Sequence, residues 1–417
     1  MARENKEITF EEVVERGCGL DVHKNEIVAT VSGTGISQET RSFQSTTRSL
    51  TELKEWLLSL GVTHVAMEST GVYWKPVMNV LEPGGFTILV VNARHIKYVP
   101  GHKTDKKDSA WICKLLRAGL LKGSFIPCRE QRDMRDLTRY RRKLVQQQVS
   151  EHNRMIRIFE DANLKLSSVF TDIRGKTCTA VIDAVLAGET DPHKLADLCT
   201  HKRLKSTKEE ITLAVEGCFT YHHKFMIESI RRSIRYIEEE IDILDEEIER
   251  RMQPIEDVVR QVCEVPGMDT KSVCELLAEI GVDMEVFPKA EHITSWAGLA
   301  PGNNESAGKS KSSHTNHGNK ATKAIMTECA WCATRTKGTY FSARYKKLAA
   351  RRGKKRALVA IAAEMLQVIY YMLKNGTAYY ELGDTYLDDK RKKAQIKYYR
   401  ENLKRLLGED LPEVQSV

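Results

Sequence analysis

The run Cys18-Gly19-Leu20-Asp21-Val22-His23-Lys24-Asn25-Glu26-Ile27 joins two short apolar segments through a polar turn. A strand over residues 18–22, the turn and a second strand over residues 27–32 have the pattern of a β-hairpin. Asp21 stands at the end of the first strand. The hairpin therefore begins a sheet and brings a carboxylate to one end of it.

The segments after the hairpin alternate between strands and helices. A third strand over residues 41–44 precedes an amphipathic helix with an apolar stripe of Leu50, Leu53, Trp56, Leu57 and Leu60. The next elements are a strand over 63–67 that ends at Glu68 and a helix-like segment over 73–81. After a breaker at Pro83-Gly84-Gly85, the chain continues with a strand over 86–91 and a helix that runs to about residue 121. A meander followed by β-α-β-α predicts an RNase H-like sheet with helices packed on it, at the start of a multidomain α/β plus α chain.

Four carboxylates point to a divalent metal in this region. Asp21 and Glu68 each end a strand-like run, and Asp105 and Asp108 open the last helix. Because these two aspartates are three residues apart, a helix projects both from one face. Mg²⁺ takes oxygen ligands and can activate a nucleophile at a phosphate. The alternative is local, since aspartate is also favoured in hairpin turns and in the first turn of a helix.

Length and charge indicate a multidomain protein with a polyanionic partner. The chain has 417 residues, a formal net charge of +8 and a pI near 8.8. Its basic residues cluster in runs within 139–143, 351–356 and 390–393. Any one run is typical of a solvated helix face, whereas several together favour nucleic acid as the partner.

The cysteines and the hydropathy pattern bear on the compartment. The ten cysteines have no framework spacing, and we find neither a signal peptide nor a long apolar stretch, so we expect a cytoplasmic protein with free thiols and no membrane partner. Cys329 and Cys332 have metal-like spacing, with His314 and His317 upstream. These four residues could bind zinc, but an apolar helix with core cysteines also explains the spacing.

The middle of the chain has the pattern of a coiled coil. Apolar residues recur at three-four spacing from Ile227 to Ile248, with charged residues between them. An earlier helical stretch over residues 133–160 could pair with this seam within the chain, or the seam could join protomers. Further on, Val265-Pro266-Gly267-Met268-Asp269 before a helix over 271–279 predicts a helix-hairpin-helix element that can bind a phosphate, or a simple turn between helices.

A long glycine-rich, hydroxyl-rich and basic segment runs from Trp296 to Lys320 and precedes an apolar helix over residues 321–334. It has the composition of a loop that wraps a phosphate backbone. Lys309, Lys311, His314 and Lys320 could activate a serine here, but the residues alone do not single out one hydroxyl.

The sequence resembles the bridge-RNA-guided DEDD transposases of bacterial and archaeal insertion sequences of the "one-ten" and "eleven-eleven" type, to which the Piv DNA invertases are related. The resemblance spans about residues 17–376. It rests on Gly19 through Lys24, on Glu68-Ser69-Thr70-Gly71 with Lys103 through Ala110, on Gly298-Leu299-Ala300-Pro301 through Ser306 to Gly318-Asn319, and on Tyr345 through Arg351-Arg352-Gly353-Lys354 to an alanine-rich helix over 357–373.

The resemblance implies a domain order and a composite site. A RuvC-like DEDD domain would cover residues 1–125, a helical coiled-coil region 126–255 and a serine-containing transposase domain 256–376. Beyond the resemblance, residues 377–417 form a basic tail, in which a basic helix over 388–407 would contact RNA or be merely solvated. Asp21, Glu68, Asp105 and Asp108 would bind Mg²⁺ for another protomer, whose Ser306 would attack DNA. The family usually has Gly directly after this serine, whereas Ala307 follows it here. If the register shifts, Ser310, Ser312 or Ser313 takes its place.

The resemblance also implies an activity: a transposase that excises and inserts its own element through a serine-linked DNA intermediate, in a prokaryotic cytoplasm. Its partners would be donor and target double-stranded DNA, a structured bridge RNA and further copies of itself, as a homodimer or homotetramer. Nucleic acid would contact Lys309, Lys311, Lys320, Arg351, Arg352 and Lys354. The alternatives are an RNA-independent DNA invertase, which shares these motifs, and a metal-dependent Holliday-junction nuclease, which needs only the carboxylates.

Overall fold

The computed structural model describes residues 13–69, 71–92, 105–199, 205–302, 305–306, 309–310 and 314–407, and for residues 105–107, 305–306, 309–310 and 406–407 it describes the backbone alone. The chain divides into two compact units, Met1–Arg129 and Glu130–Val417. Each unit is described by itself below.

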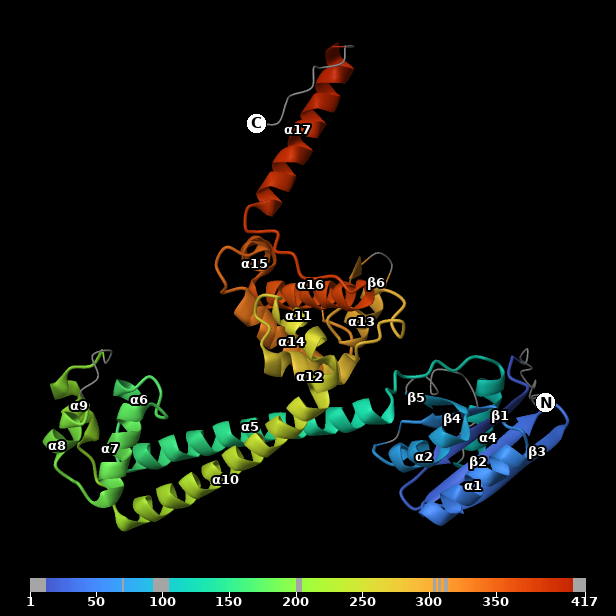
Figure 1. The fold of residues 1–417 in the computed structure, drawn as a ribbon, viewed down its shortest axis with the longest axis horizontal. Helices are drawn as coiled ribbons and strands as arrows, with labels where there is room; N and C mark the ends of the chain where they lie inside the picture. Colours follow the sequence, from blue (N-terminus) through green and yellow to red (C-terminus); the bar gives the residue numbers. More distant parts are fainter. Residues whose placement is uncertain are drawn as a thin grey trace, which may run out of the picture. The chain divides into compact units, whose positions relative to one another are not determined.

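The N-terminal unit contains a mixed five-stranded sheet in the order β3-β2-β1-β4-β5 (Figure 1). Its strands are β1 (Arg16–Val22), β2 (Glu26–Gly33), β3 (Ile36–Gln44), β4 (His64–Glu68) and β5 (Thr87–Val91). β1, β2 and β3 form an antiparallel meander, and β4 and β5 continue the sheet parallel to β1. This arrangement is consistent with the predicted RNase H-like sheet. The third strand is longer than predicted, because it starts at Ile36 rather than near residue 41.

Helices cover both faces of this sheet. Alternate strand residues such as Cys18, Leu20 and Met67 pack on one face against α1 (Thr47–Ser59) and α2 (Trp74–Leu81). A short 3₁₀ turn η1 (Glu82–Gly84) follows α2 at the predicted breaker. The other face carries Ala66, which packs against α4 (Asp105–Arg117). α4 ends at Arg117, earlier than the predicted residue 121, because the chain turns at Gly119, where φ is +67°.

The second unit contains two long antiparallel helices, α5 (Arg129–Asp161) and α10 (Tyr221–Met252) (Figure 1). Leu144 of α5 packs against Ile237 and Ile241 of α10. Gln148 bonds to Glu238, whereas Asp161, further along α5, bonds to His223, nearer the start of α10, and this reversed order defines the antiparallel direction. The seam predicted at three-four spacing therefore pairs within the chain.

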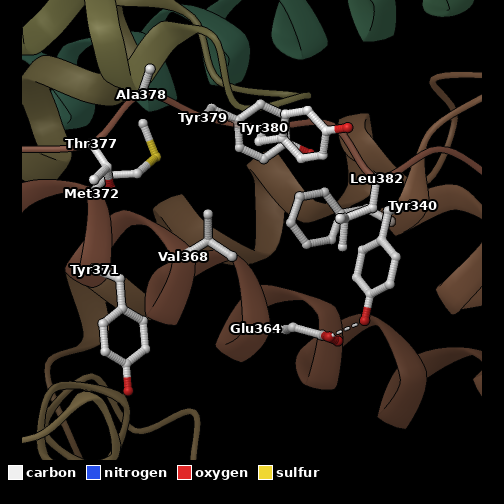
Figure 2. A pocket seen from close by; sticks show the side chains of 11 residues that line it. Tyr340, Glu364, Val368, Tyr371, Met372, Thr377, Ala378, Tyr379, Tyr380 and Leu382 are labelled. Carbon is white, nitrogen blue, oxygen red and sulfur yellow. Dashed lines mark hydrogen bonds between the residues drawn. The ribbon is translucent and has the colours of Figure 1, made fainter. Parts of the chain in front are cut away.

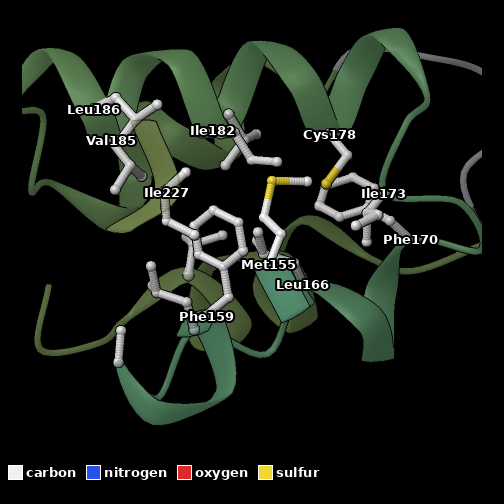
Figure 3. Close-up of a cluster of buried hydrophobic side chains, with 14 of the residues drawn as sticks. Met155, Phe159, Leu166, Phe170, Ile173, Cys178, Ile182, Val185, Leu186 and Ile227 are labelled. Atoms are coloured by element: carbon white, nitrogen blue, oxygen red, sulfur yellow. The ribbon is translucent and has the colours of Figure 1, made fainter. Parts of the chain in front are cut away.

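A small helical layer packs where α5 ends and α10 begins. It consists of α6 (Leu166–Val169), α7 (Lys176–Ala187), α8 (Pro192–Asp197) and α9 (Lys208–Val215). Figure 3 shows its core, in which Met155 and Phe159 of α5 meet Ile182 of α7 and Ile227 of α10. This buried apolar core holds the C-terminal end of α5 against the N-terminal end of α10.

The remaining helices form the C-terminal part of the second unit. They are η2 (Gln253–Ile255), α11 (Glu256–Cys263), α12 (Thr270–Ile280), α13 (Ala290–Trp296), α14 (Lys320–Ala333), α15 (Tyr340–Arg352), α16 (Lys354–Asn375) and α17 (Tyr386–Leu407). Contrary to the expectation of no long apolar stretch, α16 is long and apolar enough to cross a membrane. It is a core helix instead, because α13, α14 and α15 pack against it and Ile361, Met365 and Ile369 are fully buried.

Candidate active site

Strand register brings two of the predicted carboxylates together. Leu20 of β1 lies opposite Met67 of the parallel strand β4, so the next residues, Asp21 and Glu68, are neighbours at the carboxyl ends of both strands. Side chains alternate between the faces of a sheet, so Asp21 shares its face with Gly19, and Glu68 shares the face of Ala66. This is the face on which α4 packs.

Gly19 allows α4 to contact the sheet backbone directly. A Cβ on Gly19 would overlap the Ser109 carbonyl oxygen and the Cys113 amide nitrogen. The Cys113 thiol donates a hydrogen bond to the Gly17 carbonyl oxygen at 3.2 Å, and a buried 2.8 Å hydrogen bond joins the Thr30 and Ser109 hydroxyls. The sequence did not show this role of Gly19, since it depends on which helix covers the strand.

The direction of α4 places its acidic end near Asp21. Gly19 faces Ser109 and Cys113, whereas Gly17, earlier on β1, faces Leu116 and Arg117, so α4 runs antiparallel to β1. Its N-terminal turn, with Asp105 and Asp108, therefore lies toward the carboxyl end of the strand. The structure does not describe the Asp105 side chain.

Burial and neighbouring charges act on Asp21. Burial raises its pKa, as do the negative charges of Asp108 and Glu68, while His23 lowers it through charge and a hydrogen bond of 3.2 Å. Asp108 and Glu68 are therefore both close enough to Asp21 for their charges to act on it. Among the described side chains, no three form a set of metal donors as placed, so a metal here requires Asp105 or small rotamer changes. Sequence reasoning assigned no role to His23, although it stands two residues after Asp21.

The predicted serine loop contains a β-hairpin. β6 (Glu305–Ser306) pairs with β7 (Lys309–Ser310), with Ser306 opposite Lys309. On either side of this hairpin, an isolated antiparallel β-bridge pairs Pro301 with Thr315. The segment is thus more regular than the long wrapping loop that we expected. The side chains of Ser306, Lys309 and Ser310, and all of Lys311, Ser312 and Ser313, lie outside the described residues.

Asn319 anchors the chain directly after this loop. Its side chain accepts hydrogen bonds from the Ala321 and Thr322 amides as the N-cap of α14, and its amide nitrogen donates to Glu279 at 2.7 Å. Gly298 and Gly318 are in such close backbone contact that a Cβ on Gly318 would overlap Gly298. The two ends of the serine loop are therefore held together where α13 ends and α14 begins.

The three arginines of the basic run at 139–143 form a structural cluster, which corrects for them our expectation of a solvated face or a nucleic-acid contact; Lys143 is exposed. Arg139 forms two hydrogen bonds of 2.6 and 2.9 Å with Glu279, whose side chain is 1% exposed. Arg135 bonds to the same carboxylate, and burial lowers the pKa of Arg135 to about 10 against the opposing effect of Glu279. Arg141 and Arg142 both bond to Glu275. These arginines join α5 to α12 instead of facing a phosphate backbone.

The zinc interpretation finds no support. Cys329 is buried in α14 and Cys332 is exposed. All four candidate residues are described, and no group of three donors capable of binding a metal forms among them or elsewhere in the described residues. Cys329 is a core cysteine, and burial raises its pKa to about 11, so its thiol stays protonated.

The predicted helix-hairpin-helix turn connects α11 to α12. Gly267, at φ +85°, lies so close to α14 that a Cβ would overlap the Cys329 carbonyl oxygen and the Ala333 amide nitrogen. The Asp269 carboxylate accepts a hydrogen bond from the Ser272 amide at the start of α12. A negative charge and tight packing at this turn fit the connecting role better than phosphate binding.

The other predicted contacts with nucleic acid lie on the surface. Lys320, Arg351, Arg352 and Lys354 are exposed. Lys320 begins α14, just after the serine loop, and the other three stand where α15 ends and α16 begins. They are free to contact a polyanion, in contrast to the run at 139–143.

Comparison with known proteins defines the class. Residues 18–163 match the DEDD family model of the IS110 type, described as a transposase, and residues 259–346 match the transposase model of the IS116/IS110/IS902 family. Two separate parts of the chain are therefore similar to transposases. The two matches lie along the chain in the order that the sequence motifs implied.

A curated relative points the same way. The "Insertion element IS110 uncharacterized 43.6 kDa protein" of Streptomyces coelicolor (strain ATCC BAA-471 / A3(2) / M145) is 28% identical over 177 residues, which are 41% of this chain. The chain spans 42% of the length of that relative. The likeness therefore concerns less than half of either protein.

Proposed function

We propose that this protein is a bridge-RNA-guided DNA transposase that excises and inserts its own insertion sequence through a serine-linked DNA intermediate. The observation that carries the proposal is the gathering of Asp21, Glu68 and Asp108 at one end of an RNase H-like sheet. The same chain carries a second transposase domain with the serine hairpin. A nuclease that cuts with activated water would need only the first of these features.

Mg²⁺ suits the carboxylate cluster. Oxygen ligands from Asp21, Glu68, Asp105 and Asp108 would hold it, and it would supply charge stabilisation at the scissile phosphate. The like charges around Asp21 fit this assignment, because clustered carboxylates repel one another unless a cation or protons neutralise them. His23, 3.2 Å from Asp21, would orient that carboxylate.

Ser306 would be the nucleophile. Its hydroxyl oxygen would form a bond to the phosphorus of a DNA phosphodiester while the bond to the leaving deoxyribose oxygen breaks; the serine loses its proton and the leaving oxygen gains one. Attack of another strand's hydroxyl on this phosphoserine ester would rejoin DNA and release the serine. The anchored base of the loop supports this role, since it fixes the ends of the segment that carries Ser306.

The division of the chain follows from this proposal. Residues 1–125 would form the RuvC-like domain, 126–255 the coiled-coil region, 256–376 the serine-containing domain and 377–417 the basic tail. Bridge RNA would choose donor and target DNA by base pairing, while the protein recognises backbone and shape. Lys309, Lys311, Lys320, Arg351, Arg352 and Lys354 would contact nucleic acid. Two or four copies would assemble in the prokaryotic cytoplasm.

The test is a denaturation-resistant protein–DNA adduct. Purified protein is incubated with Mg²⁺, RNA transcribed from the element's flanks and labelled donor DNA, and the adduct is resolved on a denaturing gel. We expect an adduct in the wild type that disappears in Ser306→Ala and in Asp21→Ala. Ser310→Ala is the matched control, because it removes a hydroxyl from the other strand of the same hairpin.

The possible results separate the rival activities. An adduct that survives Ser306→Ala but not Ser310→Ala would move the nucleophile to β7. An adduct that forms equally without RNA would indicate an invertase-like recombinase. Metal-dependent cleavage without any adduct would leave a nuclease and overturn the serine mechanism.

A further inference from the structure

An aromatic groove lies between α15, α16 and the segment that follows α16. Its volume is about 300 Å³, and its lining includes Tyr340, Tyr371 and Tyr380. Figure 2 shows Val368 between Tyr371 on one side and Tyr340 on the other, with Tyr380 above them. Most of the lining follows residue 346, where the second family match ends.

One carboxylate holds the wall of this groove in place. Glu381 accepts hydrogen bonds from the Tyr340 amide, the Gly383 amide and the Tyr379 hydroxyl, each at 2.8 Å. The segment 377–382 is thereby tied to the start of α15. The groove is therefore formed before any ligand enters it, which lowers the entropy lost on binding.

Aromatic rings in the groove remain exposed. Tyr380 is 78% exposed and Tyr371 is 51% exposed, while Phe341 at 1% exposure closes the base. Exposed rings over an apolar base offer flat faces on which a planar group can stack. The lining includes one carboxylate, Glu364. Its negative charge is compensated within the protein, because it accepts hydrogen bonds from the Tyr340 hydroxyl at 2.5 Å and from Arg344 at 3.3 Å.

A strongly basic helix begins at the edge of this groove. The ring of Tyr386, the first residue of α17, packs edge-on against Tyr340 with 5.9 Å between centroids, and Lys347 bonds to Asp388 at 2.5 Å. The basic side chains of α17 are exposed or half-exposed, namely Lys390, Arg391, Lys392, Lys393, Lys397, Arg400, Lys404 and Arg405. The acidic residues of α17 are only Asp388, Asp389 and Glu401. An aromatic groove beside this charge suits a ligand that is both planar and anionic.

We propose that the groove binds an unpaired base of a single-stranded nucleic acid. The base stacks on Tyr371 and Tyr380, and the phosphates on either side lie along the basic face of α17. Sequence-tolerant binding of single strands combines these two elements, aromatic stacking and a basic track. The proposal rests on the nucleic-acid function proposed above and adds a site whose stacking residues, Tyr371 and Tyr380, lie outside both family matches.

The experiment measures binding of full-length protein to short fluorescent oligonucleotides. Each probe carries 2-aminopurine at one central position or an abasic residue at the same position, in an RNA and a DNA version. Tyr371→Ala and Tyr380→Ala should weaken binding of the 2-aminopurine probe by roughly 5- to 150-fold, the range of one lost base stack. Tyr371→Phe and Tyr380→Phe should keep the affinity, and the abasic probe should bind all variants alike.

Tyr236→Ala is the matched control, because Tyr236 is 62% exposed on α10 and does not line the groove.

Tighter binding of the RNA probe would assign the base to a guide RNA, and tighter binding of the DNA probe to an unpaired strand of the element; both results support the site. Unchanged affinity in the Ala variants, or an equal loss with the abasic probe, would overturn it. So would a loss of self-association without nucleic acid, which would make the groove a protein contact. A wild type that binds neither probe would remove the proposed nucleic-acid function as well.

Discussion

Asp21 carries a cost in stability that a metal should relieve. Burial and neighbouring carboxylates raise its pKa above 3.8, so the folded chain holds this proton more tightly than the unfolded chain. Stability therefore decreases as the pH rises from the unfolded pKa through the folded pKa. Asp21→Asn should stabilise the metal-free protein by about 1 kcal/mol at neutral pH, and this gain should vanish below pH 4. Thermal unfolding across this pH range measures the difference.

Added Mg²⁺ gives the control for this prediction. A ligand that binds the folded state raises the melting temperature, so Mg²⁺ should stabilise the wild type and have little effect on Asp21→Asn. Asp257→Asn, at a side chain that is 97% exposed, should behave as the wild type does. An equal shift in all three proteins would argue against metal binding at Asp21.

Gly19 gives a second prediction at the scale of the residue. Gly19→Ala forces a methyl group against the Ser109 carbonyl and the Cys113 amide, so α4 must move away from β1. We expect a loss of about 1–3 kcal/mol in unfolding free energy, the usual cost of overpacking, together with a lower adduct yield. In the same unit, Gly123→Ala is the control, because its Cβ meets no atom closer than 3.5 Å. Urea denaturation of both variants measures the cost, and similar losses would refute the packing role.

The positions of Asp21 and Glu68 in the fold could be predicted from the sequence because each stands at or near the end of a strand. The alternation of apolar residues shows where β1 and β4 end, so Asp21 and Glu68 could be placed there. The need for glycine at position 19 could not be predicted in the same way. Glycine is needed there because the backbone contacts Ser109 and Cys113, which lie 90 or more positions further along the chain. The sequence around position 19 does not indicate such a distant contact.

At the scale of elements, the arginines of α5 stabilise the attachment of α5 to α12. Glu279→Gln removes the buried carboxylate that pairs with Arg135, whose side chain is 12% exposed, and with the half-exposed Arg139. We expect a loss of about 3–5 kcal/mol, as for other buried ion pairs that lose one partner. Glu247→Gln is the control, since Glu247 pairs with Arg250 and Arg251 on the surface of α10, where the cost should be under about 1 kcal/mol. Equal denaturation midpoints would contradict this role.

Asn319 should affect activity more than stability. Both Asn319 and Asp269 cap helices, α14 and α12, and replacing either by Ala should cost about 1 kcal/mol. Only Asn319 also bonds to Glu279 directly after the serine loop. We therefore expect Asn319→Ala to reduce the adduct yield well below that of Asp269→Ala in the same gel assay. Equal yields would show that the anchor does not position Ser306.

Helix seams could be predicted, but the partners of charged residues could not. The three-four spacing identified α10 correctly, because burial of isoleucine follows the helical period. The run at 139–143 was misinterpreted, because Glu275 and Glu279 lie more than 130 positions away and a charge pattern on one helix does not show what covers it. The serine hairpin was missed for another reason: glycine and serine residues predict a loop, whereas pairing of two-residue strands depends on the Pro301–Thr315 bridge.

At the scale of the whole molecule, the carboxylates and the serine belong to different compact units, Met1–Arg129 and Glu130–Val417. The resemblance to guided transposases implies that carboxylates of one protomer serve the serine of another. The seam of α10 is covered within its own chain, so the proposed association of protomers would use other surfaces. A mixture of two inactive variants separates an assembly of this kind from a chain that acts alone.

Ser306→Ala and Asp21→Ala proteins are each inactive under the proposed mechanism, but a mixed dimer unites one intact serine with carboxylates from the other protomer. If subunits exchange randomly, half of the dimers are mixed and each contains one competent site, so adduct formation should return to about one quarter of the wild-type level. Refolding or co-expression of the two variants, followed by the adduct gel, gives the measurement. The control mixture of Asp21→Ala with Glu68→Ala should stay inactive, because each of the two proteins lacks one of the proposed metal-binding carboxylates. No recovery in the first mixture would mean that each chain uses its own carboxylates with its own serine.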